Sequence, residues 1–155
     1  MANRPRLYSP YDAPLWDSIS SERMQLQTCD DCHVTRYPPG PACPKCLSLR
    51  YHWEDIAGKG RVLSWTTFHR EYLPAYPAPH TVVAVELDEG PIMIGYVVRE
   101  EVDKLAINSA VQLQYGRHPD GYAIPYFTLD PSADRLRNSG NFRSSGAHWI
   151  LQGRS

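Results

Sequence analysis

The sequence predicts a mainly β protein built from two small modules. All four cysteines fall in one stretch, "CDDCHVTRYPPGPACPKC" (residues 29–46), as two Cys-x-x-Cys pairs with ten residues between them. From residue 61 onward, five segments show the alternation and the β-branched or aromatic content typical of strands. The chain has 155 residues, of which 42% are hydrophobic, so it can form a real core in one ordinary domain or two small modules.

A short helix is expected to open the ordered part of the chain. Asp12 can cap this helix, and the early Pro14 is harmless because the first helical N–H groups have no partner within the helix. Residues 24–28 (MQLQT) then alternate apolar and polar side chains, which predicts a strand exposed on one face and leading into Cys29. The buried stripe of the helix would comprise Leu15, Trp16 and Ile19.

The cysteine segment needs support other than a regular strand ladder, because its prolines at 38, 39, 41 and 44 favour turns and remove backbone donors. No secretory signal or run of about 18 apolar residues is evident, so we expect a cytoplasmic protein, and disulfides rarely persist there. Two thiolate pairs on tight turns can surround one Zn²⁺ tetrahedrally and leave no open catalytic position. Iron, a redox dithiol and unliganded packing cysteines are the alternatives. The predicted ligands of one structural Zn²⁺ are Cys29, Cys32, Cys43 and Cys46.

The second module is expected to be a five-stranded barrel. A hairpin turn is predicted at residues 88–91 (DEGP), where Gly90 can adopt positive φ. A short helix at residues 100–105 would lie between the third and fourth strands, where OB barrels commonly have one, so the order predicts an OB-fold. Pro125 cannot donate to a ladder, which places the fifth strand at an edge or a bulge. The five expected strands are residues 61–70, 81–87, 92–99, 111–117 and 122–129.

The last residues resemble neither module. After Asp130 the chain is rich in Ser, Asn, Gly and Arg, lacks periodicity, and ends near a small apolar group at residues 148–151 (HWIL). We therefore expect four parts: an N-terminal helical segment (1–23), a zinc ribbon (24–56), an OB-fold domain (57–131) and a flexible tail (132–155).

Charge and motif content argue against two classes of function. Sixteen basic and seventeen acidic residues give a formal charge of -1, whereas single-strand nucleic-acid binding requires a basic groove with interleaved aromatic residues. The predicted central hairpin is acidic, with Glu86, Asp88 and Glu89. The six histidines are scattered and form no recognisable set with a carboxylate and a nucleophile, so a free-standing enzyme is not favoured either.

Together with the short helix and the cysteine pairs, "GKGRVLSWTTFH" and "VVAVELDEGPIMIGYVV" resemble the DUF35 family over about residues 10–131. This resemblance implies a rubredoxin-like zinc ribbon followed by an OB-fold. It also implies a function, because members of the family resemble non-catalytic partner subunits of thiolase-superfamily enzymes or of hotdog-fold enoyl-CoA hydratases. The family usually has glycine after the second cysteine of each pair, but this chain has His33 and Leu47. Because glycine eases the positive φ of a knuckle, this difference puts zinc affinity in doubt rather than zinc identity.

The loop after the first barrel strand is the candidate contact region. Its sequence, "TTFHREYLPAYP", is aromatic and stiff, a composition suited to an interface or to stacking on adenine. Arg70, Arg99 and Arg117 could pair with coenzyme A phosphates if they converge. The alternatives are an exposed strand-end histidine, a loop packed on its own barrel and solvated arginines. The candidate contacts with acyl-CoA or with a partner are His69, Arg70, Tyr72 and Tyr76.

The resemblance to the DUF35 family implies a non-catalytic accessory subunit, and we expect it in a hetero-oligomer with a thiolase or retro-aldolase that acts on acyl-CoA. The subunit would help to bind or channel the thioester and would stabilise the complex, while catalysis would belong to the partner. A hydratase partner and a single-stranded nucleic-acid-binding role are the alternatives. Neither nucleic acid nor a membrane is the expected partner.

Overall fold

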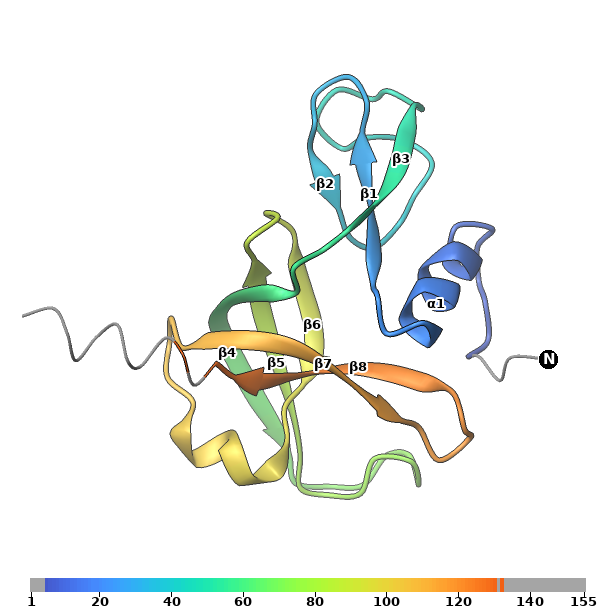
Figure 1. The fold of residues 1–155 in the computed structure, drawn as a ribbon. Coiled ribbons are helices and arrows are strands. Elements are labelled where there is room, and N and C mark those ends of the chain that lie inside the picture. Colours follow the sequence, from blue (N-terminus) through green and yellow to red (C-terminus); the bar gives the residue numbers. More distant parts are fainter. Residues whose placement is uncertain (1–4, 131, 133–155) are drawn as a thin grey trace, which may run out of the picture.

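The computed structural model describes residues 5–130 and residue 132, and it has the predicted mainly β architecture. A helix and a three-stranded ribbon precede a nearly closed five-stranded antiparallel barrel (Figure 1). The elements are α1 (Asp12–Ser20), β1 (Gln25–Cys29), β2 (Thr35–Arg36), β3 (Tyr51–Asp55), β4 (Lys59–Phe68), β5 (His80–Leu87), β6 (Ile92–Tyr96), the 3-10 helix η1 (Arg99–Lys104), β7 (Ala110–Arg117) and β8 (Ala123–Leu129).

Helix α1 begins differently from the prediction. Asp12 is the first helical residue, and the N-cap is Tyr11, which makes no side-chain capping bond. The Asp12 carboxylate instead accepts hydrogen bonds from the backbone N–H groups of Tyr8 and Ser9, at 2.7 and 2.8 Å. These bonds, with that from Tyr8 the largest effect, lower the pKa of Asp12. The predicted cap was therefore wrong, because this carboxylate closes the turn before the helix. Of the predicted stripe, Leu15 and Ile19 are buried and Trp16 is half-buried.

Strand β1 has no exposed face, which contradicts the alternation seen in the sequence. It lies between β2 and β3 in the ribbon sheet, and Gln27 is fully buried. The Gln27 side-chain oxygen accepts hydrogen bonds from Arg36 Nε at 2.7 Å and from the Gly40 backbone N–H at 2.8 Å. The buried Arg36 guanidinium also lies 5.0 Å from the centre of the Tyr51 ring. A polar residue in a strand pattern was thus buried by a local hydrogen-bond network.

The barrel sheet has the order β6-β5-β4-β7-β8, and its two end strands approach each other. Val97, just after β6, forms a parallel bridge with Phe127 of β8. Gly95 allows this approach, because a Cβ atom there would lie 2.8 Å from the ring of the fully buried Phe127. Strand β8 is an end strand of the sheet, so Pro125 occupies an edge, as predicted.

Several boundaries differ from the predicted ones. Strand β4 ends at Phe68, so His69 and Arg70 lie in the following loop, and β6 ends at Tyr96 rather than at Arg99. The predicted hairpin is confirmed: Gly90 has φ +106° and donates its N–H to the Leu87 carbonyl at 2.8 Å. Residues 133–155, with the apolar group at 148–151, lie outside the described part. No helix in the described part is long and apolar enough to cross a membrane.

Candidate metal centre and barrel-end pocket

Each Cys-x-x-Cys pair forms a tight backbone knuckle. The His33 N–H donates to the Cys29 carbonyl at 3.0 Å, and the Leu47 N–H donates to the Cys43 carbonyl at 2.9 Å. His33 and Leu47 adopt φ of 57° and 62°, the left-handed conformation that glycine has most readily. Both knuckles therefore form the expected turn without glycine.

The knuckles bring all four cysteine sulfur atoms within 4.8 Å of one another. Cys29 Sγ lies 3.6 Å from Cys46 Sγ, and Cys32 Sγ lies 3.4 Å from Cys43 Sγ. None of the four forms a disulfide. Four sulfurs bound to zinc at about 2.3 Å would be roughly 3.8 Å apart in a tetrahedron, so the spacing fits the metal. This rubredoxin-like cluster fits a structural Zn²⁺ site, because four thiolates fill the tetrahedral coordination shell.

Knuckle amides favour the thiolate forms that a metal requires. The backbone N–H of Cys32 is the main cause that lowers the pKa of Cys29, and that of Cys46 is the main cause that lowers the pKa of Cys43 to about 6. The Ser48 backbone N–H also lowers the pKa of Cys46, but the neighbouring thiols and burial outweigh it and raise the value to about 12. A cation among the sulfurs would offset the repulsion between thiolates.

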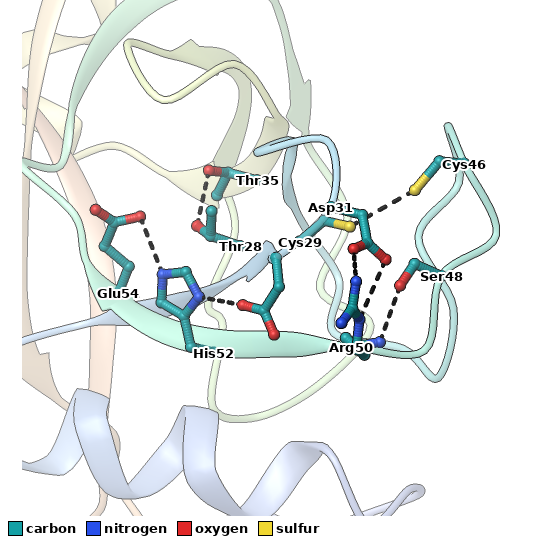
Figure 2. Close-up of polar contacts among 10 residues, drawn as sticks. Thr28, Cys29, Asp31, Thr35, Cys46, Ser48, Arg50, His52 and Glu54 are labelled. Carbon is teal, nitrogen blue, oxygen red and sulfur yellow. Dashed lines mark hydrogen bonds and ion pairs between the residues drawn. The ribbon is translucent and has the colours of Figure 1, made fainter.

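Side-chain contacts connect the first knuckle to the strand that follows the second one (Figure 2). Asp31 pairs with Arg50, whose backbone N–H donates to Ser48 Oγ at 3.1 Å. Asp30 lies 2.7 Å from Nδ1 of His52 in β3. Hydrogen bonds from Ser48 and then Arg50 lower the pKa of Asp31. Because these groups are largely exposed, we assign them a positioning role rather than a large contribution to stability.

Leu47→Gly is expected to make zinc release slower. A non-glycine residue in the left-handed region costs roughly 1–2 kcal/mol, part of which is offset by the greater entropy of glycine in the unfolded chain. The Leu47 side chain is 77% exposed, so its removal costs little packing. Zinc transfer to a chromophoric chelator measures the effect. Leu49→Gly is the matched control, because Leu49 is also exposed but is absent from the positive-φ residues; equally fast release from both variants would contradict the strain argument.

A pocket of about 650 Å³ lies at the end of the barrel away from the ribbon. It is lined by residues of the loop between β4 and β5, of η1 and of the turn between β7 and β8, and Figure 1 shows these three segments on the side of the barrel away from the ribbon. The predicted contacts His69 and Tyr76 line this pocket, as do Arg99 and Arg117. Arg70 and Tyr72 instead line a smaller pocket of about 200 Å³, which shares Tyr76 and His80 with the first. The structure thus brings two of the three arginines to one pocket and places the third in its neighbour.

Sequence reasoning missed two histidines of this pocket, His80 and His118. The Tyr76 ring lies between them, with centroid distances of 5.0 Å to His80 and 5.6 Å to His118. His118 also stacks on Tyr122 at 4.3 Å. Burial lowers the pKa of His80. Both histidines adjoin a proline at a strand end, but only the closed barrel brings these distant segments together.

Comparison with known proteins agrees with both modules. Profiles described as "ChsH2, rubredoxin-like zinc ribbon domain" and "ChsH2, C-terminal OB-fold domain" match residues 16–52 and 53–115. A probable enoyl-CoA hydratase alpha subunit from Thermomonospora curvata is 33% identical over 127 residues, which are 81% of this chain and 40% of that protein. A DUF35 domain-containing scaffold protein from Pyrococcus furiosus is 28% identical over 55% of this chain and 62% of its own length.

The chain therefore spans less than half of the hydratase subunit and somewhat under two thirds of the scaffold protein. It matches a solved chain over a larger share: a chain of a structure titled "Ltp2-ChsH2(DUF35) aldolase" is 31% identical with a TM-score of 0.72. That match covers 81% of this chain and 98% of the other. The predicted resemblance is thus confirmed, and the chain belongs to the DUF35 family, with a ChsH2-type zinc ribbon and OB-fold.

Proposed function

We propose that this chain is a non-catalytic accessory subunit of a thiolase-superfamily enzyme, a thiolase or a retro-aldolase, that acts on acyl-CoA. The observation that supports this most is its similarity to nearly the whole of a chain in an aldolase structure whose title names ChsH2 and DUF35. In our proposal the subunit stabilises the complex and helps to hold or channel the thioester, and the partner supplies the reactive groups.

The ribbon is suited to a structural role in such a complex. We propose one Zn²⁺ per chain, with Cys29, Cys32, Cys43 and Cys46 as its ligands, because their sulfurs are clustered at a spacing that fits the metal. Four thiolates leave no position for a substrate or an activated water. The metal would therefore fix the knuckles, and with them the surface that a partner meets.

The barrel end is suited to the thioester. Arg70 and Tyr72 line one pocket and His69 lines the adjoining one, and Tyr76 belongs to both. Guanidinium groups bind phosphates bidentately, and aromatic rings stack on adenine. We propose that these four residues contact acyl-CoA or the partner when the complex forms.

Two other assignments have less support. A hydratase partner is favoured by the 33% identity to a hydratase alpha subunit, but this chain covers only 40% of that protein. Single-stranded nucleic acid is disfavoured by the formal charge of -1, because such binding depends on a continuous basic track.

Turnover measurements test the division of labour. The zinc-loaded chain alone is expected to show no thiolase, aldolase or hydratase activity, whereas its co-expression with a thiolase-superfamily enzyme from the same organism should raise that enzyme's soluble yield or turnover. Arg70→Ala and Tyr72→Ala should weaken acyl-CoA binding by the complex without releasing zinc. Robust turnover by the isolated chain, surviving stringent purification, would refute the accessory role, and tight oligonucleotide binding at physiological salt would favour the nucleic-acid alternative.

A further inference from the structure

We infer that the 650 Å³ barrel-end pocket is itself a binding site for a flat, ring-bearing organic anion, and that the Nε2–H of His118 is one of its donors. The inference concerns this chain alone, whichever enzyme it assembles with. It rests on the bonding of His118, on the aromatic walls and on the charges of the lining.

His118 has a defined hydrogen-bonding state. It directly follows β7 and is only 7% exposed. The Asp120 backbone N–H donates to Nδ1 at 3.1 Å, so the neutral ring must have its proton on Nε2. The Asp120 carboxylate lies 3.4 Å from the same Nδ1 and would pair with it in the charged ring, which also retains Nε2–H. In both states the turn uses Nδ1 and leaves Nε2–H as a donor.

Aromatic rings fix the orientation of this donor and form the walls. His118 is stacked on Tyr122, with planes 12° apart, and is tilted by 58° against Tyr76. His80 continues the wall between Tyr76 and Tyr96, with centroid distances of 5.0 and 6.0 Å. Rings favour one another at centroid distances of about 4.5–7 Å, so a flat ligand ring finds suitable faces here. The pocket volume is also within the usual range for small ligands, about 300–1,000 Å³.

The lining favours an anion. The ionised side chains that line it are the guanidinium groups of Arg99 and Arg117 and the carboxylate of Asp103, so cations exceed anions in the lining itself. The Asp120 carboxylate lies outside this lining and is 76% exposed, and it faces Nδ1 of His118, the ring nitrogen that is not the proposed donor. Guanidinium groups bind carboxylate or phosphate through paired hydrogen bonds. A metal is not the expected occupant, because the cysteine cluster is the one group of metal-binding side chains close enough together in the described part of the chain.

Two kinds of ligand combine a flat ring with an anionic group. The adenine nucleotide end of coenzyme A is a flat ring with phosphates, and a free aromatic carboxylate is a flat ring with one anionic group. Calorimetric titration of the full zinc-loaded chain, without a partner, separates them. The probes are adenosine 3′,5′-bisphosphate, coenzyme A and 2-naphthoate, and 2-naphthalenemethanol is the uncharged control.

We expect at least one of the anionic rings to bind and the uncharged ring to bind at least tenfold more weakly. His118→Phe keeps a ring against Tyr122 but removes the donor, and it should weaken binding at least tenfold, because it removes a hydrogen bond to a charged group. Arg99→Gln, in η1, should weaken it similarly. Arg61→Gln, an exposed residue of β4 that lines neither pocket, is the matched control for the lost charge and should bind like the unmodified chain.

Binding of the bisphosphate but not the naphthoate would identify the nucleotide as the source, and the reverse would identify a free ring carboxylate. The inference is overturned if no anionic ring binds, or if both His118→Phe and Arg99→Gln fold and bind like the unmodified chain. Because no partner is present, such a failure would leave the accessory role to be judged by the turnover experiment.

Discussion

Cys43→Ser is expected to abolish stoichiometric zinc binding and to unfold the ribbon. Cys43 is buried, its sulfur lies 3.4 Å from that of Cys32, and its pKa is lowered to about 6, mainly by the Cys46 backbone N–H. A serine hydroxyl would replace a thiolate that zinc prefers. Since metal binding and folding of a small site are coupled, loss of this ligand should also disorder the proline-rich loop. Metal analysis and circular dichroism on the same sample measure both effects.

Lys45→Ala is the control for this substitution, because Lys45 lies in the same knuckle with an exposed side chain. It should retain one zinc per chain and unfold like the unmodified protein. The structural-zinc assignment fails if the unmodified chain is fully folded without metal, or if Cys43→Ser still holds one zinc with unchanged unfolding.

Gly60→Ala is expected to destabilise the barrel by about 3 kcal/mol, at the upper end of the usual overpacking cost. Gly60 lies where β4 pairs with β5 on one side and β7 on the other, opposite Leu87 and Val111. A Cβ atom there would lie 2.4 Å from the Glu86 carbonyl oxygen. A backbone atom cannot move aside by changing rotamer, so the strands must separate. Urea unfolding of the zinc-loaded chain gives the change in free energy of unfolding.

The matched control is Gly40→Ala. A Cβ atom at Gly40 meets no atom within 4 Å, and this glycine has no positive φ. Its substitution should leave stability unchanged or raise it slightly, because alanine restricts the unfolded chain more than glycine does. If both variants unfold alike, close strand approach at Gly60 does not limit the stability of the barrel.

Features encoded by neighbouring residues could be predicted from the sequence. The spacing of the cysteine pairs predicted the sulfur cluster, because each knuckle closes within one short turn. Residues 88–91 predicted the hairpin for the same reason, since Gly90 supplies the positive φ of its turn. The OB-fold followed from the succession of five β segments with one short helix between the third and the fourth.

Features that depend on which partner a side chain meets could not be predicted. Gln27 looked exposed because it alternates with apolar neighbours, yet Arg36 and Gly40 bind its side chain in the interior. Asp12 had the residue type of a helix cap, but the preceding turn supplies its partners. His80 and His118 come from segments that meet only when the barrel closes, so no local pattern identified their shared pocket.

The most direct test of the accessory role is the molar mass of the complex. The full zinc-loaded chain, co-expressed with a thiolase-superfamily enzyme from the same organism, should elute from a sizing column with multi-angle light scattering as one species with a fixed ratio of the two chains. Cys43→Ser should elute apart from the enzyme, because the ribbon that forms part of the proposed contact surface is unfolded. Separate elution of the unmodified chain and the enzyme at every concentration, with both proteins folded, would contradict the proposed accessory role.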